Sequence, residues 1–339
     1  MFAKRIGVFA FSAVAALSNA HSEERPAEER PAEERPIQYV LISFDGAGPV
    51  SQWQRSRQLA AEVDAEFTYF LSCVYLLTSE NRSNYIAPGS NGPKSNVGYA
   101  SSREDVAARL EQIWSARAEG HEIASHGCGH LDGAKWSKAD WKHEFAQFTQ
   151  ILLNAWKLNG IDGEPAEWQQ FVANEITGFR APYLSYSENL FKAESKNGFL
   201  YDASTVSRDP AAVTKKGGLY RFSLPLIPEG PSARPVIAMD YNLYVRHSGG
   251  EERPEQGSVY EQRAYDAFMA AFDKEYAGNR TPLQIGLHFT LMNDGAYWRA
   301  LEAFARNVCT MEDVRCVGNH RYLEETAPQV LSTPRRIDG

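Results

Sequence analysis

Short runs of apolar residues recur along most of the chain and alternate with stretches in which apolar residues return at helical spacing. Runs of about four to eight apolar residues are typical of strands buried in a parallel sheet, whereas a helical spacing is typical of helices with one buried face. The predicted strands are residues 37–44, 66–72, 121–126, 177–180, 199–204, 236–240 and 283–289.

Between these strands, the apolar pattern predicts helices with one buried face. Three of them begin with residues at the spacing of a capping box, and the first helix is expected to end at Gly120. The capping pairs are Ser101 with Glu104, Ser137 with Asp140, and Ser258 with Glu261. A fourth helix is predicted from the aromatic and aliphatic residues of 297–308. We interpret these aromatic stripes as core rather than as cofactor contacts.

The alternation of strand and helix over nearly the whole chain predicts the α/β class. In such proteins the strands form a parallel sheet or barrel, and functional groups lie at the carboxyl ends of the strands. Periodicity does not distinguish a barrel from an open sheet.

The first 20 residues have the pattern of a signal peptide. Lys4 and Arg5 precede an apolar run over 6–17, and small residues occupy Ser18 and Ala20. The run is short for a bilayer span, although an uncleaved anchor is the alternative. We predict cleavage near Ala20, a secreted or periplasmic protein, and no membrane insertion afterwards.

Residues 21–36 repeat the sequence Glu-Glu-Arg-Pro-Ala. Regular proline and dense charge are incompatible with a packed core, so we predict an exposed linker. The predicted folded domain is 37–327, followed by a tail over 328–339.

The composition of the chain indicates which classes of binding partner to expect. The 339-residue chain is 43% hydrophobic and 23% charged, with a formal net charge of −8 and scattered Lys and Arg. This argues against a surface that binds nucleic-acid phosphates. A neutral sugar polymer is compatible with it, because the chain has 7 Trp, 16 Tyr and 17 Phe.

The cysteines are even in number, as expected for disulfides in an exported chain. Cys309 and Cys316 bracket a short loop and are predicted to pair. Pairing of Cys73 with Cys128 follows by elimination, and buried free thiols are the alternative.

Polar residues collect where predicted strands end. They are Asp45, His126, His130, Arg180, Asp202 and His288. Each also has a structural interpretation, such as a turn cap, a surface charge or a core histidine. Their shared placement favours a functional site.

The segment His126-Gly-Cys-Gly-His130 is the most specific local feature. Two histidines four residues apart can converge on one ion, and imidazole is a common zinc ligand. Cys128 is a possible third ligand, although its place between the two histidines makes this geometrically awkward.

These residues, in this order, resemble the five motifs of the polysaccharide deacetylases of carbohydrate esterase family 4. The first segment, Ser-Phe-Asp-Gly-Ala, is similar to the family's Thr-Phe-Asp-Asp-Gly or Ala. The five segments are 43–47, 119–130, 178–183, 198–204 and 287–288. The resemblance runs from about residue 37 to about residue 325 and implies a distorted (β/α) barrel of about seven parallel strands.

The resemblance also implies roles around the attacking water. Asp45 would be the general base and Arg180 would keep it ionised. His126 and His130 would bind zinc, cobalt or another divalent ion, which would polarise the acyl oxygen and lower the pKa of the water.

On the leaving-group side, His288 would be the general acid that protonates the amine. Asp202 would orient His288 and favour its charged form. The backbone amide of Tyr183 would help to stabilise the oxyanion.

One position departs from the family pattern. The second aspartate of the first motif, a metal ligand in the family, is Gly46 here. Catalytic zinc sites usually have three protein ligands. Asp45 could bind the metal itself, Asp132 or Asp294 could supply the third ligand, or metal binding could be weak or absent.

The leading hypothesis is an exported hydrolase that removes N-acetyl groups from an N-acetylglucosamine polymer or oligomer, such as chitin or peptidoglycan. An acetylated glycan is the expected partner. The alternatives are an O-acetyl esterase acting on xylan and, because of Gly46, a non-catalytic carbohydrate-binding protein.

Overall fold

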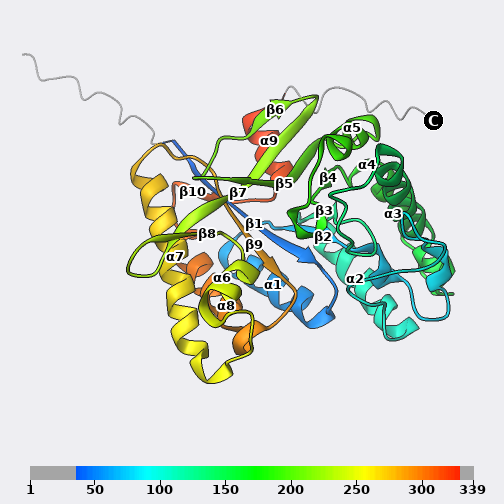
Figure 1. Cartoon of the computed structure of the whole chain (residues 1–339), viewed down its shortest axis with the longest axis horizontal. Helices are drawn as coiled ribbons and strands as arrows, with labels where there is room; N and C mark the ends of the chain where they lie inside the picture. The colour runs from blue at the N-terminus through cyan, green and yellow to red at the C-terminus, as the bar shows by residue number, and fades with distance from the viewer. Residues whose placement is uncertain (1–35, 329–339) are drawn as a thin grey trace, which may run out of the picture. The chain divides into compact units, whose positions relative to one another are not determined.

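A mostly parallel sheet forms the centre of the computed structural model, which describes residues 36–328 (Figure 1). The signal peptide, residues 21–35 of the linker and residues 329–339 lie outside the described residues, so those assignments stay predictions. The strands are β1 (Gln38–Gly46), β2 (Thr68–Leu71), β3 (Glu122–Ser125), β4 (Gly178–Phe179), β5 (Tyr201–Ser207), β6 (Thr214–Lys216), β7 (Leu219–Glu229), β8 (Arg234–Ile237), β9 (Leu283–His288) and β10 (Val314–Cys316).

The parallel strands follow one another in the order β9, β1, β2, β3, β4, β5 and β7. Residues 238–239 span the gap between β7 and β9. The amide of Ala238 donates to the carbonyl of Pro225 at 2.9 Å, and the amide of Gly286 donates to the carbonyl of Ala238 at 2.9 Å. Met239 bridges Gly286 in parallel register. The prediction of a distorted barrel of about seven parallel strands is confirmed.

Helices surround this barrel. They are α1 (Val50–Val63), α2 (Arg103–Ala118), α3 (Lys138–Leu158), α4 (Trp168–Asn174), α5 (Glu188–Lys196), α6 (Asp240–Ser248), α7 (Gly257–Ala277), α8 (Met292–Val308) and α9 (Asn319–Thr326). In the described range, none of them is long and apolar enough to cross a membrane.

Two of the predicted helix starts are wrong. The capping box of α3 is present as predicted, but α2 is capped by Ser102, whose hydroxyl accepts from the amide of Asp105. Ser258 lies inside α7, because a 3₁₀ turn over Pro254–Gln256 leads directly into that helix. The sequence pattern also missed the helices α1, α4, α5, α6 and α9 and the strands β6, β7 and β10.

Alternation along β1 separates two cores. Val40, Ile42 and Phe44 pack outward in the large core beneath the helices, whereas Leu41 joins the barrel interior. Since successive strand residues face opposite sides, Asp45 shares the inward side with Leu41. The amino end of the barrel is filled by residues of α9 and its approach, so the open end lies at the carboxyl ends of the strands.

Both predicted disulfides are confirmed. Cys73 is bonded to Cys128, and Cys309 to Cys316. The second bond joins the end of α8 to the last residue of β10, and the first lies at the carboxyl end of the barrel.

Candidate active site

Asp45 is the last residue of β1 whose side chain faces the barrel interior, and it is 4% exposed. A guanidinium nitrogen of Arg180 lies 2.7 Å from its Oδ1, and the same nitrogen donates to the hydroxyl of Ser43 at 2.9 Å. The Arg180 Nε donates to the carbonyl of Ala203 at 3.1 Å, and its guanidinium lies 4.2 Å from the ring centre of Phe70. Arg180 is thus fixed from three sides.

This ion pair decides the charge of Asp45. Burial by itself raises the pKa of the carboxyl, but Arg180, His126 and His288 outweigh it and hold the pKa below its usual value. Asp45 is therefore ionised and able to accept a proton from water. The predicted pairing of Asp45 with Arg180 is present.

His126 follows β3 and is 1% exposed. Its Nδ1 lies 2.7 Å from the carbonyl oxygen of Arg180, so Nδ1 carries the hydrogen and Nε2 keeps its lone pair. Burial lowers the pKa of His126 to about 3, which keeps the ring neutral. Nε2 is buried and has no hydrogen-bond partner in the described part of the chain.

His130 lies beside His126, with 5.1 Å between the ring centres. Burial, reinforced by His288, lowers its pKa. Its Nδ1 is also buried and without a partner among residues 36–328. The structure therefore brings two neutral imidazoles together, each with one unused nitrogen.

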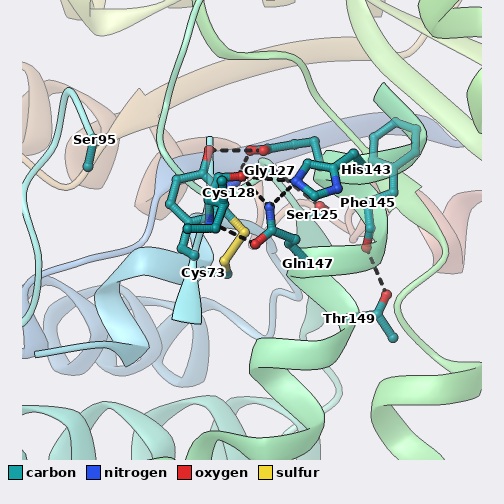
Figure 2. The surroundings of a disulfide bond; sticks show 12 residues. Cys73, Ser95, Ser125, Gly127, Cys128, His143, Phe145, Gln147 and Thr149 are labelled. Carbon is teal, nitrogen blue, oxygen red and sulfur yellow. Dashed lines mark hydrogen bonds between the residues drawn. A yellow bond between two sulfur atoms is a disulfide. The ribbon is translucent and has the colours of Figure 1, made fainter. Parts of the chain in front are cut away.

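The loop that carries these histidines is held from outside. Gly127 and His130 have φ values of 68° and 51°. Glycine adopts such a conformation easily, whereas at His130 the surrounding contacts must stabilise it. The disulfide from Cys73 fastens the middle of the loop at Cys128 (Figure 2). The amide of Cys128 donates to the buried carboxylate of Glu144 at 2.6 Å.

His288 ends β9 and is the register partner of Asp45 on the adjacent strand. Side chains of register partners in parallel strands lie on the same side of the sheet, so the two residues face one space. The Nδ1 of His288 lies 2.6 Å from Oδ1 of Asp240, and the backbone amide of His288 donates to Oδ2 of the same carboxylate at 2.8 Å.

Asp240 shapes the protonation of His288. Burial alone lowers the pKa of the imidazole, but Asp240 and then Asp45 raise it above its ordinary value. His288 is consequently suited to carry a proton near neutral pH, and its Nε2 has no hydrogen-bond partner among residues 36–328.

The expected pairing of His288 with Asp202 is wrong. Asp202 lies between Tyr201 and Ala203, which face the barrel interior, so its side chain is on the outer side of β5, whereas His288 shares the inward side with Asp45. The Asp202 carboxylate instead accepts from the hydroxyl of Ser204 at 2.6 Å and pairs with Arg221 at 3.2 Å. Because Ser204 also accepts from the amide of Ala181, Asp202 supports the backbone next to Arg180.

Sequence reasoning missed Asp240 as the partner of His288. Asp240 was placed at the end of the predicted strand 236–240, and the structure makes it the first residue of α6. It is a polar residue where an apolar run ends, the same signal that selected Asp45 and His288. That signal could have identified it.

Tyr183 lies on the opposite side of the site from Asp240. Its backbone has φ 59° and its ring packs edge-on against His130, with 4.8 Å between the ring centres. The side-chain amide of Asn96 donates to the Tyr183 hydroxyl and to the His130 carbonyl, both at 3.1 Å. The role predicted for the Tyr183 amide stays a prediction.

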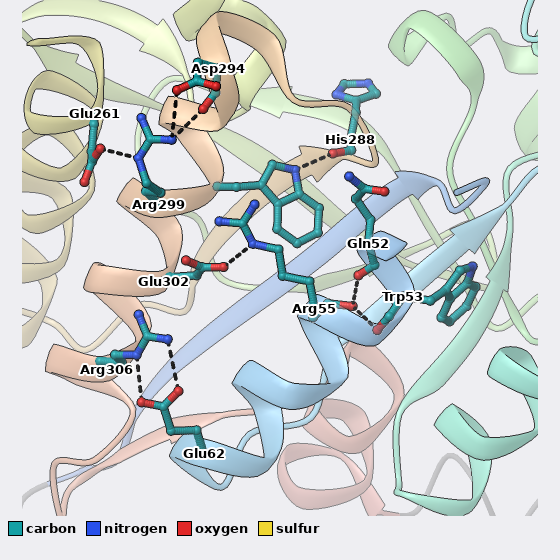
Figure 3. Close-up of polar contacts among 12 residues, drawn as sticks. Gln52, Trp53, Arg55, Glu62, Glu261, His288, Asp294, Arg299, Glu302 and Arg306 are labelled. Atoms are coloured by element: carbon teal, nitrogen blue, oxygen red, sulfur yellow. Dashed lines mark hydrogen bonds and ion pairs between the residues drawn. The ribbon is translucent and has the colours of Figure 1, made fainter. Parts of the chain in front are cut away.

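The third metal ligand expected from the family pattern is not supplied. Gly46 has no side chain, and Asp132 caps its own turn by accepting from the amide of Ala134. Asp294 lies on α8 beside Arg299 and its side chain is 75% exposed (Figure 3). Residues 36–328 contain no group of three or more His, Cys, Asp or Glu placed to hold an ion. The site therefore fits two histidine ligands and does not fit a three-ligand centre.

No protein-family model matches this sequence, and no curated protein matches it. Several solved structures have a similar fold. A protein of Mycobacterium smegmatis named as a polysaccharide deacetylase has a TM-score of 0.53 at 18% identity, covering 92% of this chain and 97% of the other. One from Pseudomonas aeruginosa PAO1, also named as a polysaccharide deacetylase, has a TM-score of 0.50 at 17% identity, covering 86% and 92%. The chain has the polysaccharide deacetylase fold.

An allantoinase, PuuE, has this fold too. It matches with a TM-score of 0.51 at 17% identity, covering 86% of this chain and 91% of the other. At these identities the likeness concerns the fold, so the chemistry of this chain must be argued from its own residues. In this version of the polysaccharide deacetylase fold, Asp45, Arg180, His126, His130 and His288 meet at one end of the barrel, together with Asp240.

Proposed function

We propose that the protein is a hydrolase that removes acetyl groups from a carbohydrate, with N-acetylglucosamine units as the first candidates. One observation supports this most strongly. Asp45 and His288 are register partners on adjacent strands, and each has a buried partner of opposite charge. The pair supplies an ionised base and a protonated acid facing the same space.

In the proposed reaction, Asp45 accepts a proton from a water molecule as the water oxygen attacks the acyl carbon. Arg180 keeps Asp45 ionised until that step. The electron pair of the acyl double bond moves onto the acyl oxygen, which becomes negatively charged.

The electron pair on the acyl oxygen then re-forms the double bond as the bond between carbon and nitrogen breaks, and His288 donates the proton on Nε2 to the leaving nitrogen. Asp240 stabilises the imidazolium before this transfer and holds the ring in place. The products are acetate and a free amine. If the leaving atom is an ester oxygen, the same proton produces an alcohol.

A divalent ion, zinc by expectation, would find two protein ligands in this site, His126 and His130. That is one fewer than catalytic zinc sites usually have. Such an ion would polarise the acyl oxygen when bound. The steps proposed above use only water and the side chains of this chain.

Two exposed aromatic rings support a sugar as substrate. Tyr183, 57% exposed, lies against His130, and Tyr241, 53% exposed, lies 6.3 Å from the His288 ring centre to centre. Tyrosine offers an apolar face together with a polar hydroxyl, as a sugar ring requires. The substrates we put forward are chitin-type or peptidoglycan chains, followed by O-acetylated xylan.

The second candidate is a carbohydrate-binding protein without catalysis. It is favoured by Gly46, which removes a side chain where the family pattern has a carboxylate ligand. We further propose that either activity operates after export, because two disulfides within the described residues suit an oxidising compartment.

Acetate release separates these candidates. The purified protein would be incubated with chitooligosaccharides, peptidoglycan fragments and acetylated xylan. Each assay would be run after chelation and again with added zinc or cobalt, and bound metal would be measured in parallel. Acetate from a glycan supports the hydrolase. Glycan binding without acetate in any condition supports the binding protein and refutes the hydrolase.

A further inference from the structure

Tyr75 occupies the space next to Gly46. It lies in a 3₁₀ turn, Cys73–Leu76, that follows β2, and Leu71 at the end of β2 is the register partner of Gly46. A Cβ atom built on Gly46 would lie 3.9 Å from the Tyr75 hydroxyl oxygen. The hydroxyl therefore lies close to where an aspartate side chain at position 46 would extend.

A second glycine allows this approach. A Cβ atom on Gly48 would come within 2.8 Å of Cζ in the Tyr75 ring, closer than real Cβ contacts. Any side chain at position 48 would displace the ring. The two glycines therefore have different effects. Gly46 provides no carboxylate, and Gly48 leaves room for the Tyr75 ring next to Gly46.

Arg109 holds the ring in this place. It is 3% exposed; its Nε donates to the carbonyl of Gly48 and its Nη1 to the carbonyl of Tyr75, both at 2.5 Å. Its guanidinium also lies 5.5 Å from the centre of the Tyr75 ring. One buried arginine thus joins the turn after β1 to the turn after β2, which fixes the hydroxyl before any ligand arrives.

The hydroxyl of Tyr75 is free to bind a ligand. Two interior tyrosines bond to neighbours: Tyr69 to Ser56 and Tyr85 to Glu144. Within residues 36–328 the Tyr75 hydroxyl has no hydrogen-bond partner, and it is not among the fully enclosed polar atoms. Burial of the ring raises the pKa of Tyr75, so the hydroxyl keeps its hydrogen at neutral pH.

We propose that the Tyr75 hydroxyl is a substrate-contacting group that donates a hydrogen bond to the acyl oxygen as that oxygen becomes negative. This role rests on the proposed hydrolase function. The hydroxyl keeps its proton throughout: the water oxygen forms the new bond to carbon, and the displaced pair rests on the acyl oxygen beside Tyr75. A fixed donor aimed at developing charge accelerates such a step without reorganisation.

The test compares Tyr75→Phe with Tyr99→Phe. Tyr99 is a matched control, because its hydroxyl is buried without a partner and it packs against the large core. Removing one oxyanion donor lowers kcat by about 10²–10³-fold. We expect that loss in Tyr75→Phe, with KM within about threefold of wild type since the contact forms mainly in the transition state. Tyr99→Phe should retain wild-type kcat, and thermal unfolding of both variants reports folding.

Binding of acetate, followed by ligand-observed NMR, distinguishes failure of this role from failure of the proposed function. If wild type releases acetate and Tyr75→Phe does so equally fast, the role of Tyr75 is refuted while the hydrolase stands. If wild type releases none, the hydrolase fails and Tyr75 is judged by acetate affinity alone. About tenfold weaker acetate binding in Tyr75→Phe would support an acyl-oxygen contact; equal affinity, or no binding to wild type, would overturn it.

Discussion

The two halves of the candidate site differ in how their polar groups are satisfied. On the side of β1 and β9, both ionisable groups are paired: Asp45 with Arg180 at 2.7 Å and His288 with Asp240 at 2.6 Å. On the side of β3, His126 and His130 each keep one buried nitrogen without a partner in the described chain. Gly46 lies between the two halves.

Under the proposed function, the paired half would transfer protons and the histidine half would bind a metal ion. Buried charges are retained only with partners, so the paired half has a fixed protonation pattern before substrate arrives. The histidine half has donors for a ligand that comes from outside the chain. Gly46 adds no carboxylate to the histidine half, and the paired half is complete without one.

Arg180→Leu should produce the largest effect, because it leaves Asp45 buried without its counter-charge. Breaking a buried ion pair from one side costs about 3–5 kcal/mol in the free energy of unfolding. Urea denaturation measures this. The control is Arg306→Leu, whose pair with Glu62 is half exposed (Figure 3) and should cost under about 1 kcal/mol. Equal losses in the two variants would contradict the structural role of Arg180.

His288→Ala tests the paired half by its chemistry. Removing a general acid lowers kcat/KM by about 10³-fold, within the usual range for such groups. Acetate release from chitooligosaccharides gives the rate. His320→Ala is the control: that histidine lies on α9 at the far end of the barrel and should change the rate by less than about twofold. Unchanged turnover in His288→Ala would refute its role as acid.

Asp240→Asn sharpens the same comparison through pH. His288 donates only when protonated, so activity is lost as pH rises through its pKa, which Asp240 raises. Removing that charge lowers the pKa, and the alkaline limb of the rate profile should move to lower pH. The acidic limb reports ionisation of Asp45 and should stay near its wild-type position.

Asp202→Asn is the control for that profile. Asp202 contacts Ser204 and Arg221 rather than His288, so the alkaline limb should stay in place even if the variant is less stable. Movement of the limb in Asp202→Asn, with none in Asp240→Asn, would restore the partner expected from the sequence.

Gly46→Asp gives the smallest expected change in stability and tests the histidine half. The φ of 84° at Gly46 disfavours any side chain by about 1–2 kcal/mol. Gly46→Ala has the same backbone penalty without the carboxylate and is the matched control. We expect both to lose similar stability and only Gly46→Asp to bind more zinc, measured by elemental analysis after dialysis. Equal zinc in both variants would show that position 46 does not face the histidines.

Much of the site follows from the sequence because the barrel converts order along the chain into proximity. Asp45, His126 and His288 each end a predicted strand, and parallel strands bring those ends together. The partner of His288 could not be chosen in this way. Asp202 also lies in a short strand, and only the structure shows that its neighbours Tyr201 and Ala203 face the barrel interior and leave Asp202 on the outer side, whereas Asp240 begins α6.

Tyr75 shows why the remainder could not be predicted. Nothing in its own sequence neighbourhood distinguishes it from a core residue of the turn after β2. Its placement depends on the absence of a side chain at Gly48 and on the hydrogen bonds from Arg109 to the carbonyls of Gly48 and Tyr75. Such a contact depends on three segments distant in sequence, and helical or strand periodicity carries no information about it.

The bond from Cys73 to Cys128 makes the histidine loop depend on the redox conditions around the protein. In a reducing compartment both residues are thiols, and the loop between His126 and His130 then keeps its hydrogen bonds but lacks this covalent link. Oxidation adds the bond to Cys73. Oxidation state therefore acts on the histidine loop directly, and a reducing agent should loosen it without any cut in the chain.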